Sequence, residues 1–223
     1  MSIKIENTEV VGWNAALRGM RNPYNSWDKA DSYWTHIEDP ETLETAPYQF
    51  FVGEADKDLA RRLVKAGTDH SKFMRMIVVY ADITAPLYWF KEYDTYKVGT
   101  VANSCSTMHK IHSKEFSLDD FSHEHLFDDD EQMEAFKSSL NRTVADLNTA
   151  REQYLETNDK KYWWQMIQLL PSSYNQRRTV MMNYAVLTNI YKARKNHKLD
   201  CWKDFCKWIE TLPYAKELIC NVD

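Results

Sequence analysis

Residues 74–92 read MRMIVVYADITAPLYWFKE, and this stretch decides the fold class. Residues 74–84 are apolar enough for a strand that is buried on both faces, and the β-branched Val78, Val79 and Ile83 favour it. Pro86 follows at a place where the first turn of a helix tolerates proline. The stretch therefore predicts a buried strand that runs directly into a helix with apolar residues on more than one side.

Further elements are predicted on the amino-terminal side of this strand. Residues 3–11 have the pattern of a short strand, and residues 13–20 place apolar side chains at i, i+3, i+4 and i+7, as on one face of a helix. Residues 22–48 are rich in Asn, Asp, Ser and Thr and predict a loop with short helical turns. A second helix covers residues 59–66 and ends at Gly67, because glycine commonly closes a helix.

The carboxyl-terminal half is predicted to be mostly helical. Residues 113–132 are crowded with Asp and Glu and predict an acidic excursion at the surface. From residue 133 an apolar spacing of three and four continues to Tyr154 and predicts a long amphipathic helix. Further helices are expected at residues 163–170, 173–195, 199–211 and 213–219. The whole chain, residues 1–223, is thus predicted to be a single helix-rich α+β domain with few strands.

Glycine is scarce in this chain, with five in 223 residues. Average usage of about 7% would give roughly fifteen. The five are scattered, so the chain has neither the G-x-G-x-x-G turn of dinucleotide-binding folds nor the G-x-x-x-x-G-K-[ST] phosphate loop. A nucleotide would have to be held by side chains, isolated backbone amides or helix ends.

Charge and hydropathy exclude several classes of partner. The net charge is −5 at pH 7, so we expect no general nucleic-acid binding. Because the sequence shows neither an export signal nor an apolar run of the ~20 residues that span a bilayer, we expect a cytoplasmic protein without a membrane partner. The four cysteines form no C-x-x-C pair and are expected to be reduced. Two basic stretches, residues 176–178 and 192–195, are local candidates for binding an anion.

Few reactive side chains form a specific pattern. His109 and His112, with His123 and His125, have only a weak metal-ligand spacing, and we predict no metal site. Cys105 has His109 four residues further on, which makes it a candidate nucleophile; the alternative is a small buried residue on a helix. No acid–base pair can be chosen among 33 carboxylates, so no catalytic residue is assigned.

Aromatic residues are abundant, with eight Trp, 13 Tyr and nine Phe. Most of the Trp residues occupy apolar helical positions and are assigned to the core. Trp27, Tyr33 and Trp34 lie in the polar loop instead, where packing does not explain them. Exposed rings of this kind are typical of a stacking site for a planar ligand or of a protein interface, and both interpretations stay open.

Three segments share their order and spacing with the motifs of one known family. They are residues 63–73 (LVKAGTDHSKF), residues 83–92 (ITAPLYWFKE) and residues 170–174 (LPSSY), the last followed by Asn183, Leu187, Asn189 and Arg194. The chain thereby resembles the flavin-dependent thymidylate synthase family over most of residues 63–212, apart from the acidic excursion and the long helix. It is identified as a divergent member of that family, which implies a helix-rich α+β fold with a small mixed or antiparallel sheet.

The signature of that family, Arg-His-Arg-x-x-Ser-x-Asn-x-x-Ser-x-Arg-Tyr, is eroded in this chain. Residues 95–97 read TYK in place of Arg-His-Arg, so that Lys97 keeps one of two cations. Thr100 stands at the first Ser. Asn103 and Ser106 match the Asn and the second Ser when one insertion is allowed.

Positions on the substrate side have changed as well. Glu92 sits where a Gln usually contacts the substrate nucleotide, and Ala185 sits where an Arg contacts its phosphate. Asp204 lies where a later Arg would be. A nucleotide monophosphate carries close to two negative charges, and bidentate Arg pairs are the usual way to bind it specifically. These losses argue against binding of deoxyuridine monophosphate (dUMP) in the family's manner.

The resemblance implies a homotetramer that holds FAD between its subunits. The residues implied to position the flavin are His70, Ser71, Lys97, Asn189 and Arg194, and those implied to face the substrate are Glu92, Asn103 and Ser106. An active enzyme would act on a pyrimidine nucleotide or a related small molecule, and it would use NADPH to reduce the flavin and folate as carbon donor only if the family chemistry is retained. The alternative is a catalytically inactive homologue of the same fold that binds a protein or another ligand.

Overall fold

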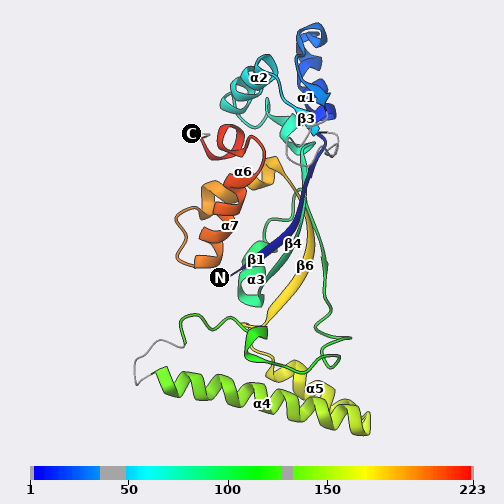
Figure 1. The fold of residues 1–223 in the computed structure, drawn as a ribbon, viewed down its shortest axis with the longest axis vertical. Coiled ribbons are helices and arrows are strands. Elements are labelled where there is room, and N and C mark those ends of the chain that lie inside the picture. The colour runs from blue at the N-terminus through cyan, green and yellow to red at the C-terminus, as the bar shows by residue number, and fades with distance from the viewer. Residues whose placement is uncertain (1–2, 36–48, 127–132, 222–223) are drawn as a thin grey trace, which may run out of the picture.

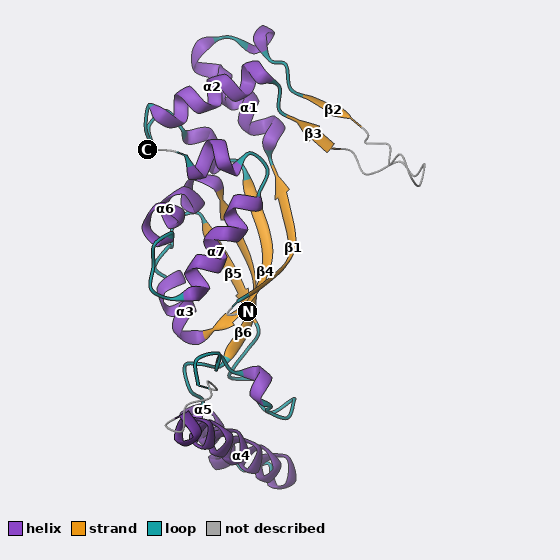
Figure 2. Cartoon of the chain, turned by 60° about the vertical axis from the view of Figure 1, so that its left-hand side comes forward, coloured by secondary structure: helices purple, strands orange, loops and turns teal. Residues whose placement is uncertain are grey.

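A four-stranded antiparallel sheet forms the centre of the molecule (Figures 1 and 2). The computed structural model describes residues 3–35, 49–126 and 133–221. The sheet has the order β1-β4-β6-β5 and comprises β1 (Lys4–Val11), β4 (Val78–Pro86), β6 (Asn175–Asn183) and β5 (Thr100–Ser104). All three neighbouring pairs are antiparallel. The predicted helix-rich α+β class with a small antiparallel sheet is confirmed.

In the part of the chain that the structure describes, helices cover one face of the sheet. Figure 2 shows α3 (Leu87–Tyr93), α6 (Tyr184–Arg194) and α7 (Asp200–Thr211) on the same side. Every second residue of β4 is completely buried beneath them, whereas Tyr80 on the other face is 42% exposed. The expectation that this strand is buried on both faces was therefore wrong, since its burial alternates with the period of two typical of an antiparallel sheet with one open face.

An aromatic cluster joins α3 to α7. Trp89 on α3 is fully buried, and its ring centre lies 4.8 Å from that of Trp202 on α7. Phe205, one turn along α7, lies 5.5 Å from Trp89, and Tyr93 lies 5.2 Å from it. Large rings in such offset and tilted arrangements contribute more than their buried area alone. The assignment of these Trp residues to the core is confirmed.

One strand occupies a segment for which helix was expected, and one predicted helix is short. Residues 173–195 were predicted to be helical, but β6 takes the first part and pairs with β4 over its whole length. The helix predicted after Pro86 is only seven residues long, because α3 ends at Tyr93, and β5 begins at Thr100. Polar Gln176 and Arg178 lie on the same face of β6 as the buried Val180, and they disguise its period of two. The pairing of β6 with β4 outweighs the weak local preference of this segment for helix.

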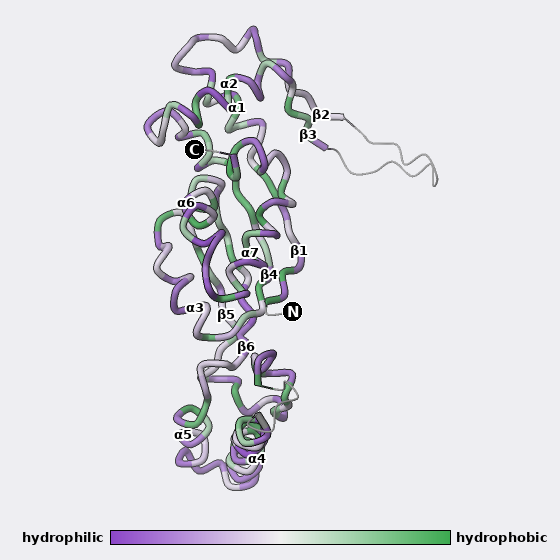
Figure 3. Tube along the Cα trace, turned by 90° about the vertical axis from the view of Figure 1, so that its left-hand side faces the viewer, coloured by the Kyte–Doolittle hydropathy of each residue, from purple (hydrophilic) through white to green (hydrophobic). Residues whose placement is uncertain are grey.

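The insertion between β5 and β6 has a hydrophobic cluster of its own at one end of the elongated molecule (Figure 3). Its helices are α4 (Met133–Thr157), which the sequence predicted, and α5 (Lys160–Leu169). Leu147, Ala150 and Met166 from these helices pack with Phe116 and Phe121. The last two lie in the predicted acidic excursion, residues 113–132, of which residues 127–132 lie outside the described residues.

A buried ion pair holds the opposite end together, where α1 (Trp13–Arg21), the hairpin of β2 (Tyr33–Thr35) and β3 (Gln49–Phe51), and α2 (Glu54–Lys65) meet. Arg21 Nε donates to Asp56 Oδ1 at 2.6 Å, and the two residues are 3% and 1% exposed. The second oxygen of Asp56 accepts from the hydroxyl and the backbone N–H of Ser32. Arg21 also donates to the carbonyl of Ser26 at 3.1 Å. These contacts fix Ser26 and Ser32 in the first part of the predicted loop, residues 22–48. Residues 36–48 lie outside the described residues.

We predict that Arg21→Met is strongly destabilising. The substitution leaves the buried Asp56 carboxylate without its charged partner, and loss of one member of a buried pair costs about 3–5 kcal/mol. Thermal unfolding followed by circular dichroism should show a melting temperature lower by on the order of 10 °C. The matched control is Arg62→Met, whose ion pair with Asp58 joins side chains 68% and 64% exposed and should change stability by less than about 1 kcal/mol. Equal shifts in both variants would contradict the assignment.

We also predict unequal effects of two glycine substitutions. Gly12 and Gly67 both adopt left-handed backbone conformations, with φ of +93° and +101°, so alanine costs roughly 1–2 kcal/mol at either position. A Cβ at Gly12 would collide with the carbonyl oxygen of Met76, whereas a Cβ at Gly67 would meet nothing within 4 Å. Urea denaturation should show Gly12→Ala to be clearly the more destabilising. Similar free energies of unfolding would show that the backbone near Met76 yields easily.

Candidate functional site

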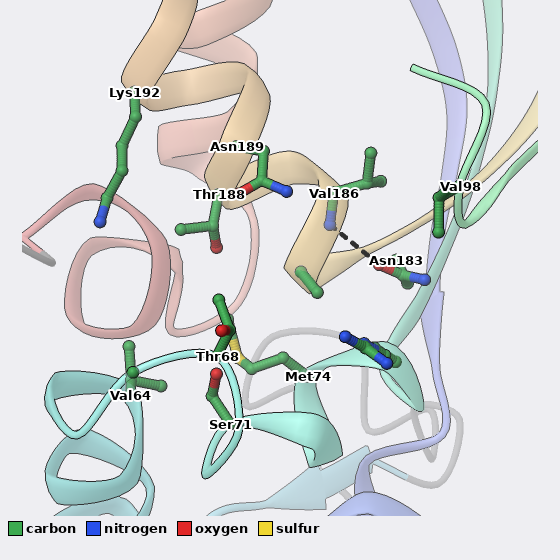
Figure 4. A pocket seen from close by; sticks show the side chains of 13 residues that line it. Val64, Thr68, Ser71, Met74, Val98, Asn183, Val186, Thr188, Asn189 and Lys192 are labelled. Carbon is green, nitrogen blue, oxygen red and sulfur yellow. Dashed lines mark hydrogen bonds between the residues drawn. The ribbon is translucent and has the colours of Figure 1, made fainter.

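A small cavity lies between the segment that follows α2 and the first turns of α6 (Figure 4). Its volume is about 210 Å³. Figure 4 shows Thr68 and Ser71 facing it from below, with Thr188 and Asn189 above them on α6 and the side chain of Lys192 extending down toward Val64. The described residues that line it are Val64, Gly67, Thr68, Ser71, Met74, Arg75, Val98, Asn183, Ala185, Val186, Thr188, Asn189 and Lys192.

Local sequence explains how these segments meet. Gly67 closes α2 in a left-handed conformation, and the backbone N–H groups of His70 and Ser71 both donate to its carbonyl. The tight turn leads into a short 3₁₀ helix, Lys72–Arg75. On the other side, Asn183 caps α6 because its Oδ1 accepts from the N–H of Val186 at 2.9 Å. One wall of the cavity is thus a turn and the other is the capped start of a helix. Hydrogen bonds hold the backbone in place on both sides.

Gly99 allows the turn that lines one side of the cavity to approach α6. Gly99 has φ of +82°, and a Cβ there would collide with the side-chain amide of Asn183. Only glycine lets the turn that carries Lys97 and Val98 approach the cap of α6 so closely. Val98 completes the lining from this turn.

The electrostatics of the cavity favour an anion. Arg75 and Lys192 line it, and neither forms an ion pair with any described residue. None of the described lining residues is acidic, although the chain as a whole has net charge −5. The start of α6 adds the partial positive charge of a helix N-terminus. Hydroxyl and amide groups of Ser71, Thr68 and Asn189 supply neutral hydrogen-bonding partners.

The structure divides the residues implied for the flavin. Ser71 and Asn189 line the cavity. His70 is exposed and lines a neighbouring hollow beside Arg21 and the end of α2. Lys97 is exposed in the turn before Gly99, and Arg194, at the end of α6, does not line the cavity.

Arg194 instead contacts a residue implied for the substrate side. Its Nη1 donates to Glu92 Oε2 at 2.7 Å, and its Nε donates to the hydroxyl of Tyr96 at 2.9 Å. The indole N–H of Trp202 donates to the same carboxylate oxygen at 2.8 Å, and the guanidinium lies over that ring at 4.7 Å. His197 Nε2 is 3.6 Å from this oxygen. Glu92 and Arg194 therefore neutralise each other in a half-buried, aromatic setting.

The two remaining substrate-side residues lie elsewhere. Asn103 is exposed on the edge strand β5, where it pairs with Thr179 of β6. The hydroxyl of Ser106 accepts from the backbone N–H groups of Met108 and His109 and so stabilises a turn. Neither residue lines the α6 cavity, so the structure does not assemble the implied substrate set in one place within this chain.

Both arginines of the first basic stretch, residues 176–178, form ion pairs. Arg177 Nη2 donates to Asp82 at 2.8 Å, and Arg178 Nη1 donates to Asp94 at 2.7 Å. Hydrogen bonds from Thr179, Arg177 and Asn7 hold the pKa of Asp82 well below its usual range. The second stretch differs, because it supplies Lys192 to the cavity.

The other reactive side chains form no site in the part of the chain that the structure describes. Cys105 is exposed just after β5 rather than buried on a helix, and no hydrogen bond joins its thiol to His109. Among the same residues there is no group of three or more His, Cys, Asp and Glu placed to hold a metal ion. No described helix has the length and apolar character needed to cross a membrane.

Some cavity residues were not found from the sequence. Thr68 lies within the recognised segment, residues 63–73, but was not assigned a role, and Arg75 lies two residues beyond it. The closing glycine at position 67 was the available signal. Asn183 was noticed as a motif residue, but its role as a helix cap depends on the strand β6 that was predicted to be helix.

Comparison with known proteins identifies the fold. No protein-family profile matches the chain, and no curated protein matches it in sequence. Two crystal structures of flavin-dependent thymidylate synthase from Helicobacter pylori, both with FAD and dUMP, match it in three dimensions. The first has a TM-score of 0.66 and 16% identity and covers 100% of this chain and 99% of the other. The second, at 2.31 Å resolution, has a TM-score of 0.65 and 18% identity and covers 98% and 97%.

The class of protein is therefore an α+β protein whose sheet is covered by helices on one face. In particular, the chain has the fold of flavin-dependent thymidylate synthase over its whole length.

Proposed function

We propose that this chain is a divergent flavin-dependent thymidylate synthase-like flavoprotein that binds FAD at the α6 cavity. The observation that carries the proposal is the cavity itself, where Arg75 and Lys192 stand without acidic partners among the described residues. The match to structures that hold FAD and dUMP supports the same ligand class.

The residues present fit the phosphates of FAD. The pyrophosphate of FAD carries two negative charges, and two cations with hydroxyl and amide donors are a suitable set of partners. Arg75 and Lys192 would hold these charges, and the hydroxyl of Ser71 and the amide N–H of Asn189 would donate hydrogen bonds to the phosphate oxygens. The start of α6 would add favourable backbone dipoles.

The size of the cavity supports assembly from several subunits. At about 210 Å³ it is smaller than the roughly 300–1,000 Å³ typical of ligand pockets. One chain would therefore supply only part of an FAD site, and a second copy would supply the rest. This agrees with the homotetramer that the resemblance implies.

The proposed reaction is a transferase reaction of nucleotide metabolism in the cytoplasm. A bound flavin would supply hydride transfer, with NADPH as reductant. The substrate would be a pyrimidine nucleotide or a related small molecule, and folate would be the carbon donor if the family chemistry is kept. This chain's own residues would bind the phosphates and orient the cofactor.

The alternative proposal is a catalytically inactive homologue of the fold that binds a protein or another ligand. The ion pair between Glu92 and Arg194 favours it, because the guanidinium is already neutralised by a carboxylate of the same chain. The site, rather than the fold, decides between these two proposals.

We predict that the purified protein binds FAD. Titration should give saturable binding and shifted flavin absorbance, and light scattering should give the mass of a tetramer. Lys192→Gln and Arg75→Gln should each weaken FAD binding about five- to tenfold, because each removes a charged hydrogen bond.

The control for this titration is Lys198→Gln, which removes an exposed cation that does not line the cavity. It should leave FAD binding unchanged. Absence of FAD binding by the unmodified protein would reject the flavin proposal and favour the second one. Equal binding by all variants would place the flavin outside the α6 cavity.

We predict that Glu92→Gln tightens binding of dUMP. The amide keeps the shape of the side chain but releases the charge of Arg194, so a phosphate meets an uncompensated guanidinium. Calorimetry should show weak binding by the unmodified protein and a few-fold gain in affinity, a modest effect because both side chains are partly exposed. The control Glu152→Gln, on the exposed face of α4, should give no gain. A loss of affinity in Glu92→Gln would show that the carboxylate itself contacts the nucleotide.

A further inference from the structure

A second and larger cavity lies where β1 ends, α1 begins and the β2–β3 hairpin starts. Its volume is about 820 Å³, and it shares no lining residue with the α6 cavity. The described residues that line it are Val10, Val11, Gly12, Trp13, Asn14, Ala15, Arg18, Trp34, Gln49, Phe50, Thr211, Pro213 and Tyr214. This size falls within the roughly 300–1,000 Å³ typical of small-molecule sites.

Aromatic rings from separate segments form its walls. Trp13 at the start of α1 is buried, and its ring centre lies 5.2 Å from that of Tyr214, which follows α7. On the hairpin, Trp34 lies 5.1 Å from Phe50, and it is 47% exposed. Trp34 is one of the aromatic residues that packing of the polar loop did not explain. A half-exposed indole at the rim of a cavity presents a flat face to which a planar ligand can stack.

The charged residues around this cavity favour an anionic ligand. Arg18 is the one charged residue among the described residues that line it, and it forms no ion pair or hydrogen bond with them. No carboxylate is present in that lining, although Asp and Glu outnumber Lys and Arg by 33 to 28 in the chain. The first turn of α1 also contains no acidic residue, and its cap position, Gly12, offers no side chain to its N–H groups. Among the described lining residues, a ligand with a single anionic group would therefore meet one cation and no carboxylate.

The walls are built before any ligand binds. Tyr214 has φ of +56°, an unusual left-handed conformation for a bulky residue, which costs roughly 1–2 kcal/mol. It is held there by the edge of Trp13 and by the N–H of Val52, which donates to its hydroxyl at 3.1 Å. Gly12 is also left-handed and is wedged against Met76. A preformed cavity loses less conformational entropy on binding than one that must be assembled.

We propose that this cavity binds a small planar aromatic anion. Its ring would stack on the aromatic walls at Trp34, and its phosphate or carboxylate would pair with Arg18. The site is independent of the proposed flavin site, because the two cavities have different linings.

The test uses calorimetric titration of the full-length protein with two probes, adenosine monophosphate as a phosphate and indole-3-acetate as a carboxylate. At least one should bind saturably below about 1 mM and at least tenfold more tightly than its uncharged counterpart, adenosine or indole-3-acetamide. The probe that binds identifies which anionic group the site takes. Arg18→Gln should abolish the preference for the charged form, and Trp34→Ala should weaken binding about tenfold, in line with the usual effect of removing one stacking ring.

Two control variants remove an exposed Trp and an exposed Arg that lie outside this cavity. Trp164→Ala removes a Trp that is 50% exposed on α5, and Arg142→Gln removes an exposed cation on α4; both should leave binding unchanged. Thermal unfolding of each variant should match the unmodified protein, because Arg18 and Trp34 are exposed.

Two results would overturn the proposal. One is the absence of saturable binding by both probes. The other is binding that falls in Lys192→Gln but not in Arg18→Gln, which would place the ligand in the α6 cavity. That second result would leave the proposed flavin site standing, and failure of FAD to bind would in turn leave this proposal standing.

Discussion

The buried contact between Arg21 and Asp56 is the constraint on which the upper end of the molecule depends. Two opposite charges with almost no exposure to water are tolerated only when each is satisfied by the other and by neighbouring hydrogen bonds. Here those bonds come from Ser26 and Ser32, which both precede the β2–β3 hairpin, so the pair holds α1, the start of the hairpin and α2 together. The pair lies at the end of α1 and the start of α2, and the opposite ends of these two helices line the two cavities.

Sequence patterns predicted the elements whose periodicity is simple. Trp13 to Met20 and the long apolar spacing from residue 133 gave α1 and α4, and the β-branched run gave β4. β6 was missed because Gln176 and Arg178 place polar groups on its inner face, where Cys105 and Asp94 receive their hydrogen bonds. Such partners are distant in sequence and cannot be seen in a local pattern. The same error hid the cap at Asn183, and with it the cavity at the start of α6.

Motif matching found single residues of the α6 cavity but not their arrangement. Ser71 and Asn189 were named in advance, and the structure brings them to one cavity. Glu92 and Arg194 were named for different ligands, yet they contact each other beneath Trp202. The carboxylate of Glu92 on α3 is thus the partner of a guanidinium on α6. A motif names such residues one at a time, and only the folded chain shows which of them contact each other.

The position of the insertion also bears on how the chain folds. β5 is an edge strand that pairs only with β6, and residues 105–174 separate the two in sequence. Closing so long a flexible loop carries an entropy cost that rises with the logarithm of its length. The cluster around Leu147 and Phe121 packs part of the insertion into a compact unit, so the flexible length between the two strands is shorter than the whole insertion. The hydrophobic core of the insertion therefore lowers the entropy cost of pairing β5 with β6.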